Sequence, residues 1–480
     1  MQIFLAYSKK KLYLCTQIKL ITMKKSLFVA CFAMYYLFLS AGPVKVSLEQ
    51  LNQDGWMHYK GQAITITTPL VVCGTMYDSL ILSEERLFVP EEKAVGLAQG
   101  DSTEYWRLAN YNQQHRIKLE CRYPFSLNLG ATVKNLTARV MGERHLQTGA
   151  QPRFKNYKPS KKLPNMKEAD VVICAANIQN YFVHVGGYAT RRNTVGQHAL
   201  QCYKVASALT RFNADIYTIC ELEQGDAAPA ELVAKMNELC GKDRYAFVLT
   251  DTCNRDTISV GFLYRKDKVR PYGALHFAYH AEGEPTQMLT GNIYAHRFML
   301  QGWQDIATGE RFTISLNHPR SKRGDPHVAN EKRMANSHAI LDALEEYKQT
   351  ETDPDYLLLG DYNAYAQEQP LQTIVEAGYQ DINSTMAPNN YSYSYKGECG
   401  YLDRCYASPS MAAQIVAISP IHWNTDYYYS AAYYSKYNYK NREIPKLAPK
   451  KIRSVMSPAA KKNRYFRYSD HDPLLIGIKF

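Results

Sequence analysis

The strongest constraint on the fold is a regular alternation of sequence patterns that begins near Glu168 and continues to the C-terminus. Short apolar runs typical of buried strands occur at residues 171–175, 215–219, 258–264, 312–316, 356–359 and 474–478. Helical patterns lie between them, at residues 197–211, 230–239 and 330–347. Strands that alternate with helices indicate a sheet core with helices packed outside it. We therefore expect residues 168–480 to form one α/β domain.

The preceding residues have a different character. Between residues 45 and 150, short β-rich segments at 63–67, 70–73, 117–120 and 131–141 are separated by turn residues. Residues 151–167 are rich in Pro, Lys and Asn and lack periodicity, which is typical of a linker. A chain of 480 residues is long enough for two domains. The sequence thus predicts a small β-rich domain, a linker and the α/β domain.

The first 42 residues have the features of an export signal. Lys24 and Lys25 precede an apolar run, Ser26–Leu39, which is followed by the small residues 40–42. The run is too short for an ordinary membrane-spanning helix, which favours a cleaved signal; the alternative is an anchor that stays on the chain. Met23 directly precedes the lysines, so residues 1–22 are interpreted as an over-long start. We expect a bacterial protein that is secreted, periplasmic or at the cell surface, with no stable membrane span in the mature chain.

Positive charge is concentrated in one segment. Removing residues 1–42 takes away six lysines and no acid, which lowers the formal charge from +12 to +6. Residues 424–468 contain eleven Lys or Arg against two acids, so the rest of the mature chain is slightly acidic. The same segment is rich in tyrosine, and cationic and aromatic side chains together suit a nucleic-acid strand. We interpret it as a wall of the substrate groove that includes Tyr437 and Lys440; the alternative is a solvated insertion that its lysines keep soluble.

The cysteines give little information on connectivity. Nine remain after residue 42, and export would permit disulfides. Cys399 and Cys405 are close enough in sequence to close a small loop, and Cys73 could pair with Cys121. Cys174 and Cys220 lie in apolar runs and are expected to be buried thiols. No Cys/His spacing indicates a zinc site.

Polar residues follow the apolar runs of the α/β domain. Asn177, Glu221 and His318 each come after one such run, and Asp361 and Asn363 follow another. Each alone is an ordinary turn or cap residue. Together they can converge at one edge of a sheet, where a rigid core would hold them in a crevice. Carboxylates and amides without clustered thiols suit a hard cation such as Mg²⁺, which can stabilise charge on a phosphoryl oxygen.

Seven segments in this order resemble the endonuclease/exonuclease/phosphatase superfamily, most closely its secreted bacterial nucleases. They are Ala175–Asn180, Cys220–Glu223, Val260–Arg265, Asn317–Lys322, Gly360–Ala364, Gly400–Asp403 and Ser469–Pro473. The resemblance covers residues 168–480 and implies a four-layer α/β sandwich, in which two mixed β-sheets are flanked by helices. Residues 45–150 resemble the β-rich, OB-like domain that precedes the nuclease domain in that branch.

The resemblance also implies roles for individual residues. Glu221 would be the principal metal ligand, with Asn177 beside it and Asp470 near the metal. Asp361 and Asn363 would hold the phosphate and the attacking water, and His318 would contact the scissile phosphate. His471, oriented by Asp403, would be the general base or would stabilise the transition state. The implied cofactor is Mg²⁺ or Mn²⁺, with an additional Ca²⁺ as a further option.

Three basic residues are candidate substrate contacts beside these motifs. Arg320 and Lys322 follow His318 and keep positive charge where the superfamily usually has it. Arg404 stands where the superfamily often has histidine, and it either grips a phosphate or faces solvent.

The predicted function is metal-dependent hydrolysis of nucleic acid, most simply DNA, outside the cytoplasm. One alternative keeps the site and changes the substrate to a phospholipid headgroup or a small phosphorylated molecule. The other is a non-catalytic binding module, which would show broken catalytic positions, whereas the positions named above are intact. Nothing in the sequence indicates an obligatory protein partner.

Overall fold

The computed structural model describes residues 42–76, 79–121, 127–149, 152–184, 195–250, 258–277, 298–427 and 464–480. The chain groups into two compact units. The smaller comprises Met1–Pro69, Leu119–Arg122 and Val133–Pro152, and the larger comprises Leu70–Lys118, Tyr123–Thr132 and Arg153–Phe480. The segment Leu70–Lys118 clusters with the larger unit; the domain boundaries expected at 45–150, 151–167 and 168–480 stay predictions, as does the OB-like character of the first.

The smaller unit is rich in β-structure, as expected for this part of the chain. Strand β1 (Val44–Val46) pairs in parallel with β2 (Ala63–Ile66), which pairs antiparallel with β8 (Leu136–Gly142), and β8 pairs with β9 (His145–Thr148). Side chains of β8 alternate between buried and exposed, as they do in a sheet with one face against a core. Helix α2 (Leu48–Asp54) begins at Ser47, whose hydroxyl accepts a hydrogen bond from the Gln50 amide. Strands β6 (Ile117–Cys121) and β7 (Thr132–Val133) contain residues of both units.

The first segment of the larger unit contains helices that the sequence pattern did not predict. It contains β3 (Leu70–Met76), β4 (Ser79–Ser83), β5 (Leu87–Phe88), α3 (Pro90–Lys93) and α4 (Thr103–His115). Only β-segments were expected here, so helix α4 was missed. Its only buried residue is Asn112, and its few apolar side chains are partly exposed among many polar ones, so its helical pattern was not recognised.

Two six-stranded mixed sheets form the centre of the larger unit. The first has the order β12 (Tyr245–Phe247), β13 (Ile258–Arg265), β11 (Ile216–Glu223), β10 (Val171–Tyr181), β23 (Leu474–Ile478) and β22 (Ile415–Pro420). The second has the order β14 (Val269–Phe277), β15 (Phe298–Asp305), β16 (Arg311–Asn317), β17 (Tyr356–Asp361), β21 (Asp403–Ala407) and β18 (Gln380–Asp381). Each contains one parallel pair, β10 with β11 and β16 with β17. The expected strands of the α/β domain are confirmed.

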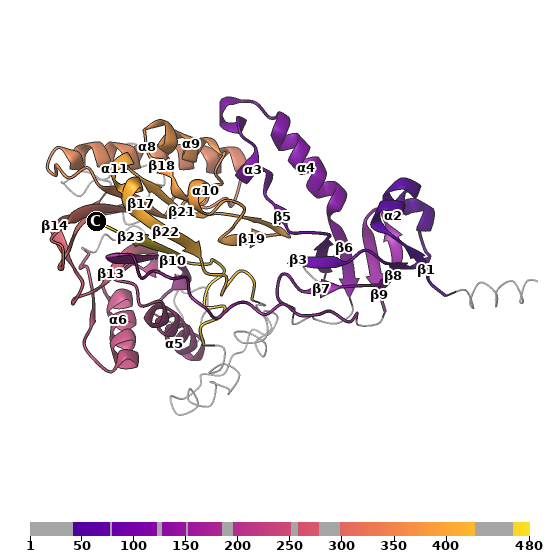
Figure 1. The fold of residues 1–480 in the computed structure, drawn as a ribbon, viewed down its shortest axis with the longest axis horizontal. Helices are drawn as coiled ribbons and strands as arrows, with labels where there is room; N and C mark the ends of the chain where they lie inside the picture. Colours follow the sequence, from indigo (N-terminus) through magenta and orange to yellow (C-terminus); the bar gives the residue numbers. More distant parts are fainter. Residues whose placement is uncertain are drawn as a thin grey trace, which may run out of the picture. The chain divides into compact units, whose positions relative to one another are not determined.

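The sheets pack face to face and helices cover their outer faces (Figure 1). Ile173 of β10 and Phe262 of β13 share one core with Ile314 of β16 and Leu357 of β17. Helices α5 (Val195–Phe212) and α6 (Ala227–Cys240) pack on the first sheet, and α8 (Pro326–Lys348) and α9 (Gln369–Glu376) on the second. Short helices α10 (Ile382–Met386) and α11 (Pro409–Gln414) and the hairpin β19 (Tyr393–Tyr395) and β20 (Glu398–Gly400) complete the unit. This mixed α/β architecture confirms the expected fold class.

A buried ion-pair cluster joins the segment before residue 118 to the second sheet. The Arg404 guanidinium on β21 is fully buried and donates to both Glu92 oxygens, at 2.7 and 2.6 Å, and to Asp381, at 2.7 Å. Strand β5 also pairs in parallel with β20. Residues near Glu92 are therefore part of the folded body that carries the second sheet.

Two expectations about cysteines are wrong. Cys73, Cys399 and Cys405 are free thiols, so neither proposed disulfide forms. Cys174 and Cys220 are buried thiols, as expected. Within the described part of the chain, the helices are all too short or too polar to cross a bilayer.

Removing the Glu92 carboxylate should destabilise the larger unit strongly. Glu92→Ala leaves the buried Arg404 charge only partly compensated, and we expect a loss of about 3–5 kcal/mol in unfolding free energy, measured in urea. Glu345→Ala is the control, because it removes an exposed carboxylate paired with Lys348 and should cost less than about 1 kcal/mol. Equal losses in the two variants would contradict a stabilising role for the buried cluster.

Candidate active site

The expected site residues come from strand ends that meet at one edge of the two facing sheets. Asn177 and Glu221 lie near the C-terminal ends of the parallel strands β10 and β11. His318 follows β16, and Asp361 ends the neighbouring parallel strand β17. Strand β23 is antiparallel to β10, so His471, just before β23, reaches the same edge. Asp403 begins β21 and pairs directly with Asp361.

A backbone irregularity positions Glu221. The pairing of β11 with β13 shifts register between Cys220 and Leu222, and Glu221 has a φ of 68°. A positive φ is unfavourable for a residue with a side chain and is commonly found at functional sites. Here the bulge turns the Glu221 side chain to the sheet edge, where one of its oxygens accepts a hydrogen bond from the Asn180 amide at 2.7 Å.

Gly360 brings the strands of His318 and Asp361 unusually close. Its φ is 141°, and a Cβ at this position would lie 1.9 Å from the Asn317 carbonyl oxygen. No side chain fits there, so only glycine allows β17 to approach β16 this closely immediately before Asp361. The Gly-Asp sequence is therefore a steric requirement of the site.

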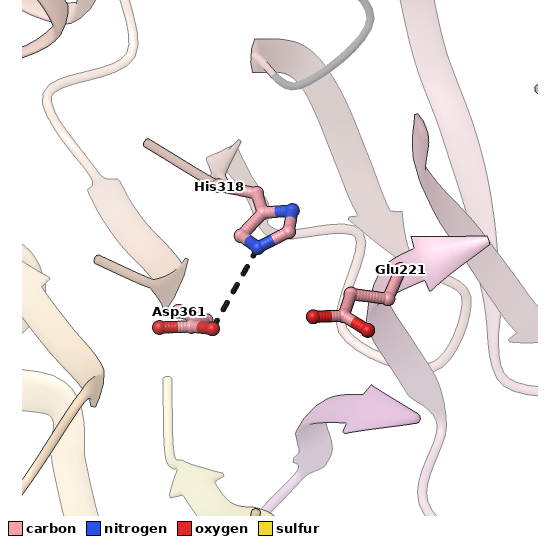
Figure 2. A group of neighbouring side chains, drawn as sticks. All are labelled: Glu221, His318 and Asp361. Atoms are coloured by element: carbon pink, nitrogen blue, oxygen red, sulfur yellow. Dashed lines mark ion pairs between the residues drawn. The ribbon is translucent and has the colours of Figure 1, made fainter. Parts of the chain in front are cut away.

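The Asp361 carboxylate is the centre of the cluster. Its Oδ2 accepts a hydrogen bond from Asn177 at 2.9 Å and lies 3.7 Å from His318 Nε2 and 3.8 Å from His471 Nε2. Its Oδ1 accepts from the Asn363 amide at 2.9 Å. Figure 2 shows the His318 ring directed at Asp361 while Glu221 points into the same space.

Glu221, His318 and Asp361 form a group that fits a divalent cation. Each offers a ligand atom, and these atoms all lie within 4.8 Å of one another. The two carboxylates are suitable ligands for Mg²⁺ or Mn²⁺, which also retain bound water, and the His318 imidazole lies beside them. Sequence reasoning assigned His318 to the phosphate and did not include it among the metal ligands.

Asn177 contacts the carboxylates through its amide nitrogen. Nδ2 donates to Glu221 at 3.2 Å and to Asp361 at 2.9 Å, whereas Oδ1 accepts from the Gln179 amide. The oxygen that a cation would need is thus used by the backbone. This geometry favours Asn177 as the residue that holds the two carboxylates in place, and direct ligation stays a prediction.

His471 is held by two neighbours. Its Nδ1 lies 2.8 Å from Asp403 Oδ2, which directs Nε2 toward Asp361. The ring of Tyr393 on β19 packs against the imidazole, with 4.6 Å between centroids and 35° between planes. Sequence reasoning missed Tyr393; the alternating tyrosines at 391, 393 and 395, just before the Gly400–Asp403 segment, were the available signal.

Burial and neighbouring charges shift the pKa values of these groups. Burial, together with the charge of Asp403 and against the opposing effect of His471, raises the pKa of Asp361 to about 7. Burial also raises the pKa of Glu221, and the charge of Asp470 adds to this effect, which places Asp470 close to the site. Burial lowers the pKa of His471, but Asp403 and Asp361 outweigh it and raise this pKa well above its usual value. The two carboxylates therefore favour the protonated form of the His471 imidazole.

The predicted substrate-contact residues lie in different environments, and they do not all reach the site. Arg320 is partly exposed beside His318, and Lys322 pairs with Glu368 and lies 4.8 Å from the Tyr365 ring centroid. Arg404 is fully buried and held by Glu92 and Asp381, which argues against the predicted contact with substrate and against a solvent-facing position. Tyr437 and Lys440 lie outside the described residues.

The chain is similar to known members of one protein family. The model of the endonuclease/exonuclease/phosphatase family matches residues 201–471. A solved family protein from Bacteroides vulgatus is 15% identical, with a TM-score of 0.41, and the match covers 65% of this chain and 98% of that one. A mannosyl-6-phosphatase of Bacteroides thetaiotaomicron is 15% identical, with a TM-score of 0.41, and the match covers 65% of this chain and 100% of that one. The catalytic domain of human Nocturnin is 12% identical, with a TM-score of 0.39, and the match covers 65% of this chain and 94% of that one. No curated protein sequence matches the chain.

Cation binding should weaken as the pH falls through the pKa of Asp361. A proton on this carboxylate, whose pKa is raised to about 7, competes with the cation. By calorimetry, the dissociation constant for Mn²⁺ should rise about tenfold between about pH 8 and about pH 6, because the deprotonated fraction falls by that factor.

The variants for this titration differ in one carboxylate. Asp361→Asn should bind Mn²⁺ weakly at every pH, whereas Asp342→Asn, at an exposed position of α8, should behave like the wild type. A wild-type affinity that is the same at both pH values would contradict a role for Asp361 in holding the cation.

Proposed function

The chain belongs to the endonuclease/exonuclease/phosphatase family, and on this basis we propose that it is a secreted, divalent-metal-dependent phosphodiesterase that hydrolyses nucleic acid, most simply DNA. Members of this family are phosphoesterases and related hydrolases, typically dependent on a divalent metal. The observation that carries the proposal is the buried Asp361 carboxylate, which faces Glu221 and lies between the His318 and His471 imidazoles.

A cation would be held by Glu221 and Asp361, with His318 beside it. When bound, it supplies positive charge that stabilises the phosphoryl oxygens as they become more negative. Asn177 donates to both carboxylates and so fixes their separation before substrate arrives. Asn363 is held by the Pro319 carbonyl at 3.2 Å, which sets its position beside the phosphate.

The positions of Asp361 and His471 support the proposed acid–base roles. Asp361, whose Oδ2 lies next to both imidazoles, is placed to accept the proton of the attacking water. The protonated His471 is suited to stabilise charge on the phosphate as the bond to the leaving oxygen breaks. Asp403 holds the imidazole and compensates its charge, at 2.8 Å. Of the two roles expected for His471, we propose transition-state stabilisation.

The substrate and the location rest on the sequence. The order of the seven segments resembles secreted bacterial nucleases, and the basic, tyrosine-rich stretch before Ser469 suits a nucleic-acid strand. Lys24 to Gly42 has the form of an export signal. Identifying the first residue of the natural protein would test export, and a chain that still begins before Ser26 would contradict cleavage.

Replacing the central groups should abolish hydrolysis without unfolding the protein. His471→Ala should lower kcat on DNA by about 100-fold or more, since it removes a positioned proton donor. Glu221→Gln should have a similar effect, partly reversed by excess Mn²⁺, because it weakens the cation site. His338→Ala and Glu346→Ala change exposed residues of α8 and are the matched controls.

The assay should include DNA, RNA, a phospholipid and a small phosphomonoester, each with and without chelator. Hydrolysis of DNA or RNA that requires the added metal supports the proposal. Turnover that resists the chelator would contradict the metal-dependent mechanism. Activity confined to the phospholipid or the phosphomonoester would support the active site but contradict nucleic acid as the substrate.

Asp403→Asn should act mainly on turnover. It keeps the shape of the contact with His471 but no longer stabilises the imidazolium, so kcat should fall by about two to four orders of magnitude. KM should change little, because Asp403 faces His471 and not the substrate. A variant whose KM rises while kcat is retained would contradict this orienting role.

A further inference from the structure

The hairpin formed by β19 and β20 begins at the catalytic imidazole and extends outward from it. Tyr393, the first residue of β19, packs on the His471 ring. Tyr393 pairs with Gly400 and Tyr395 pairs with Glu398, so the two tyrosines lie on the same face of the strand. Tyr395 is therefore the next aromatic ring along this face, about 6.6 Å further along the strand from Tyr393.

Tyr395 is exposed, whereas Tyr393 is largely covered. The side chain of Tyr395 is 57% exposed, and the Lys396 ammonium lies 5.1 Å from its ring centroid. Tyr393 packs against a small cluster of Val89, Tyr365 and Leu402, which holds the base of the strand in place. The strand thus presents an exposed ring two residues from the ring that packs on His471.

The charge on this face suits an anionic strand. Glu398, the acidic residue opposite Tyr395, is paired with Arg116 at 2.5 Å, so its charge is compensated. Lys396 adds positive charge at the tip of the hairpin. A phosphate group next to Tyr395 would thus meet a net attractive surface.

We propose that Tyr395, supported by Tyr393, is a stacking subsite for the nucleobase next to the scissile phosphate. The inference rests on the proposed function, since it needs a nucleic-acid strand in the site. Aromatic rings bind bases through their faces, with little regard to sequence, and the position beside His471 fixes which nucleotide is bound. The subsite therefore favours single-stranded or locally unpaired nucleic acid, whose bases are free to stack.

The test uses two substrates with the same backbone, a single-stranded oligonucleotide and a strand of equal length made only of abasic residues. Tyr395→Ala should lower kcat/KM for the oligonucleotide about tenfold, which is the loss expected for one base stack. It should leave the rate on the abasic strand unchanged, because that strand has no base to stack.

Two further variants separate stacking from general effects. Tyr395→Phe keeps the ring and should retain wild-type rates on both strands. Tyr272→Ala is the matched control. Tyr272 lies on the edge strand β14, where the Arg311 guanidinium is 3.8 Å from the centroid of the tyrosine ring. This variant should change the rate on neither substrate.

Two results would overturn the subsite. One is an unchanged rate of Tyr395→Ala on the oligonucleotide; the other is an equal loss on both strands, which would indicate a distorted hairpin. A wild-type protein that hydrolyses neither strand, nor duplex DNA, nor RNA would instead overturn the proposed function. In that case, oligonucleotide binding measured by fluorescence anisotropy tests the stacking subsite without relying on hydrolysis. Equal affinities of the wild type and Tyr395→Ala would overturn the subsite.

Discussion

The site depends on one costly feature, the burial of the Asp361 carboxylate at the meeting point of the two sheets. A buried carboxylate is stable as an anion only where donors and positive charges surround it. Asn177, the Asn363 amide and two imidazoles provide these contacts, and they come from four different segments of the chain. The fold thus brings distant residues together around a single charge, and the same charge makes the group suited to hold a cation and to accept a proton.

The packing of the two sheets fixes the positions of the residues around Asp361. The core shared by the two sheets fixes strands β10, β11, β16 and β17, and β23 is inserted between β10 and β22. The C-terminal strand therefore carries His471 to the sheet edge where the earlier strands end. Local backbone strain occurs at this edge, in the positive φ of Glu221 and the close approach at Gly360. The packed core of the two sheets holds these residues in place, and its stability offsets the cost of their unfavourable backbone geometry.

Much of the α/β region could be predicted because its strands are strongly apolar and its polar residues follow them directly. Asn177, Glu221, His318 and Asp361 converge as the pattern indicates. Long-range partners could not be predicted in this way. Glu92 lies 312 residues from Arg404, and no local pattern shows that their charges will meet inside the protein. Helix α4 and Tyr393 were missed for related reasons: the first buries almost no apolar surface, and the second acquires its role only from the imidazole it contacts.

The central claim is that Glu221 and Asp361, with His318, hold a divalent cation next to His471. Anomalous diffraction from crystals of the protein grown with Mn²⁺ tests it most directly. We expect a peak within bonding distance of a Glu221 oxygen and an Asp361 oxygen, at about 2.0–2.3 Å, and its loss in Glu221→Gln. A fully occupied Mn²⁺ bound elsewhere, with no peak between these carboxylates, would contradict the account.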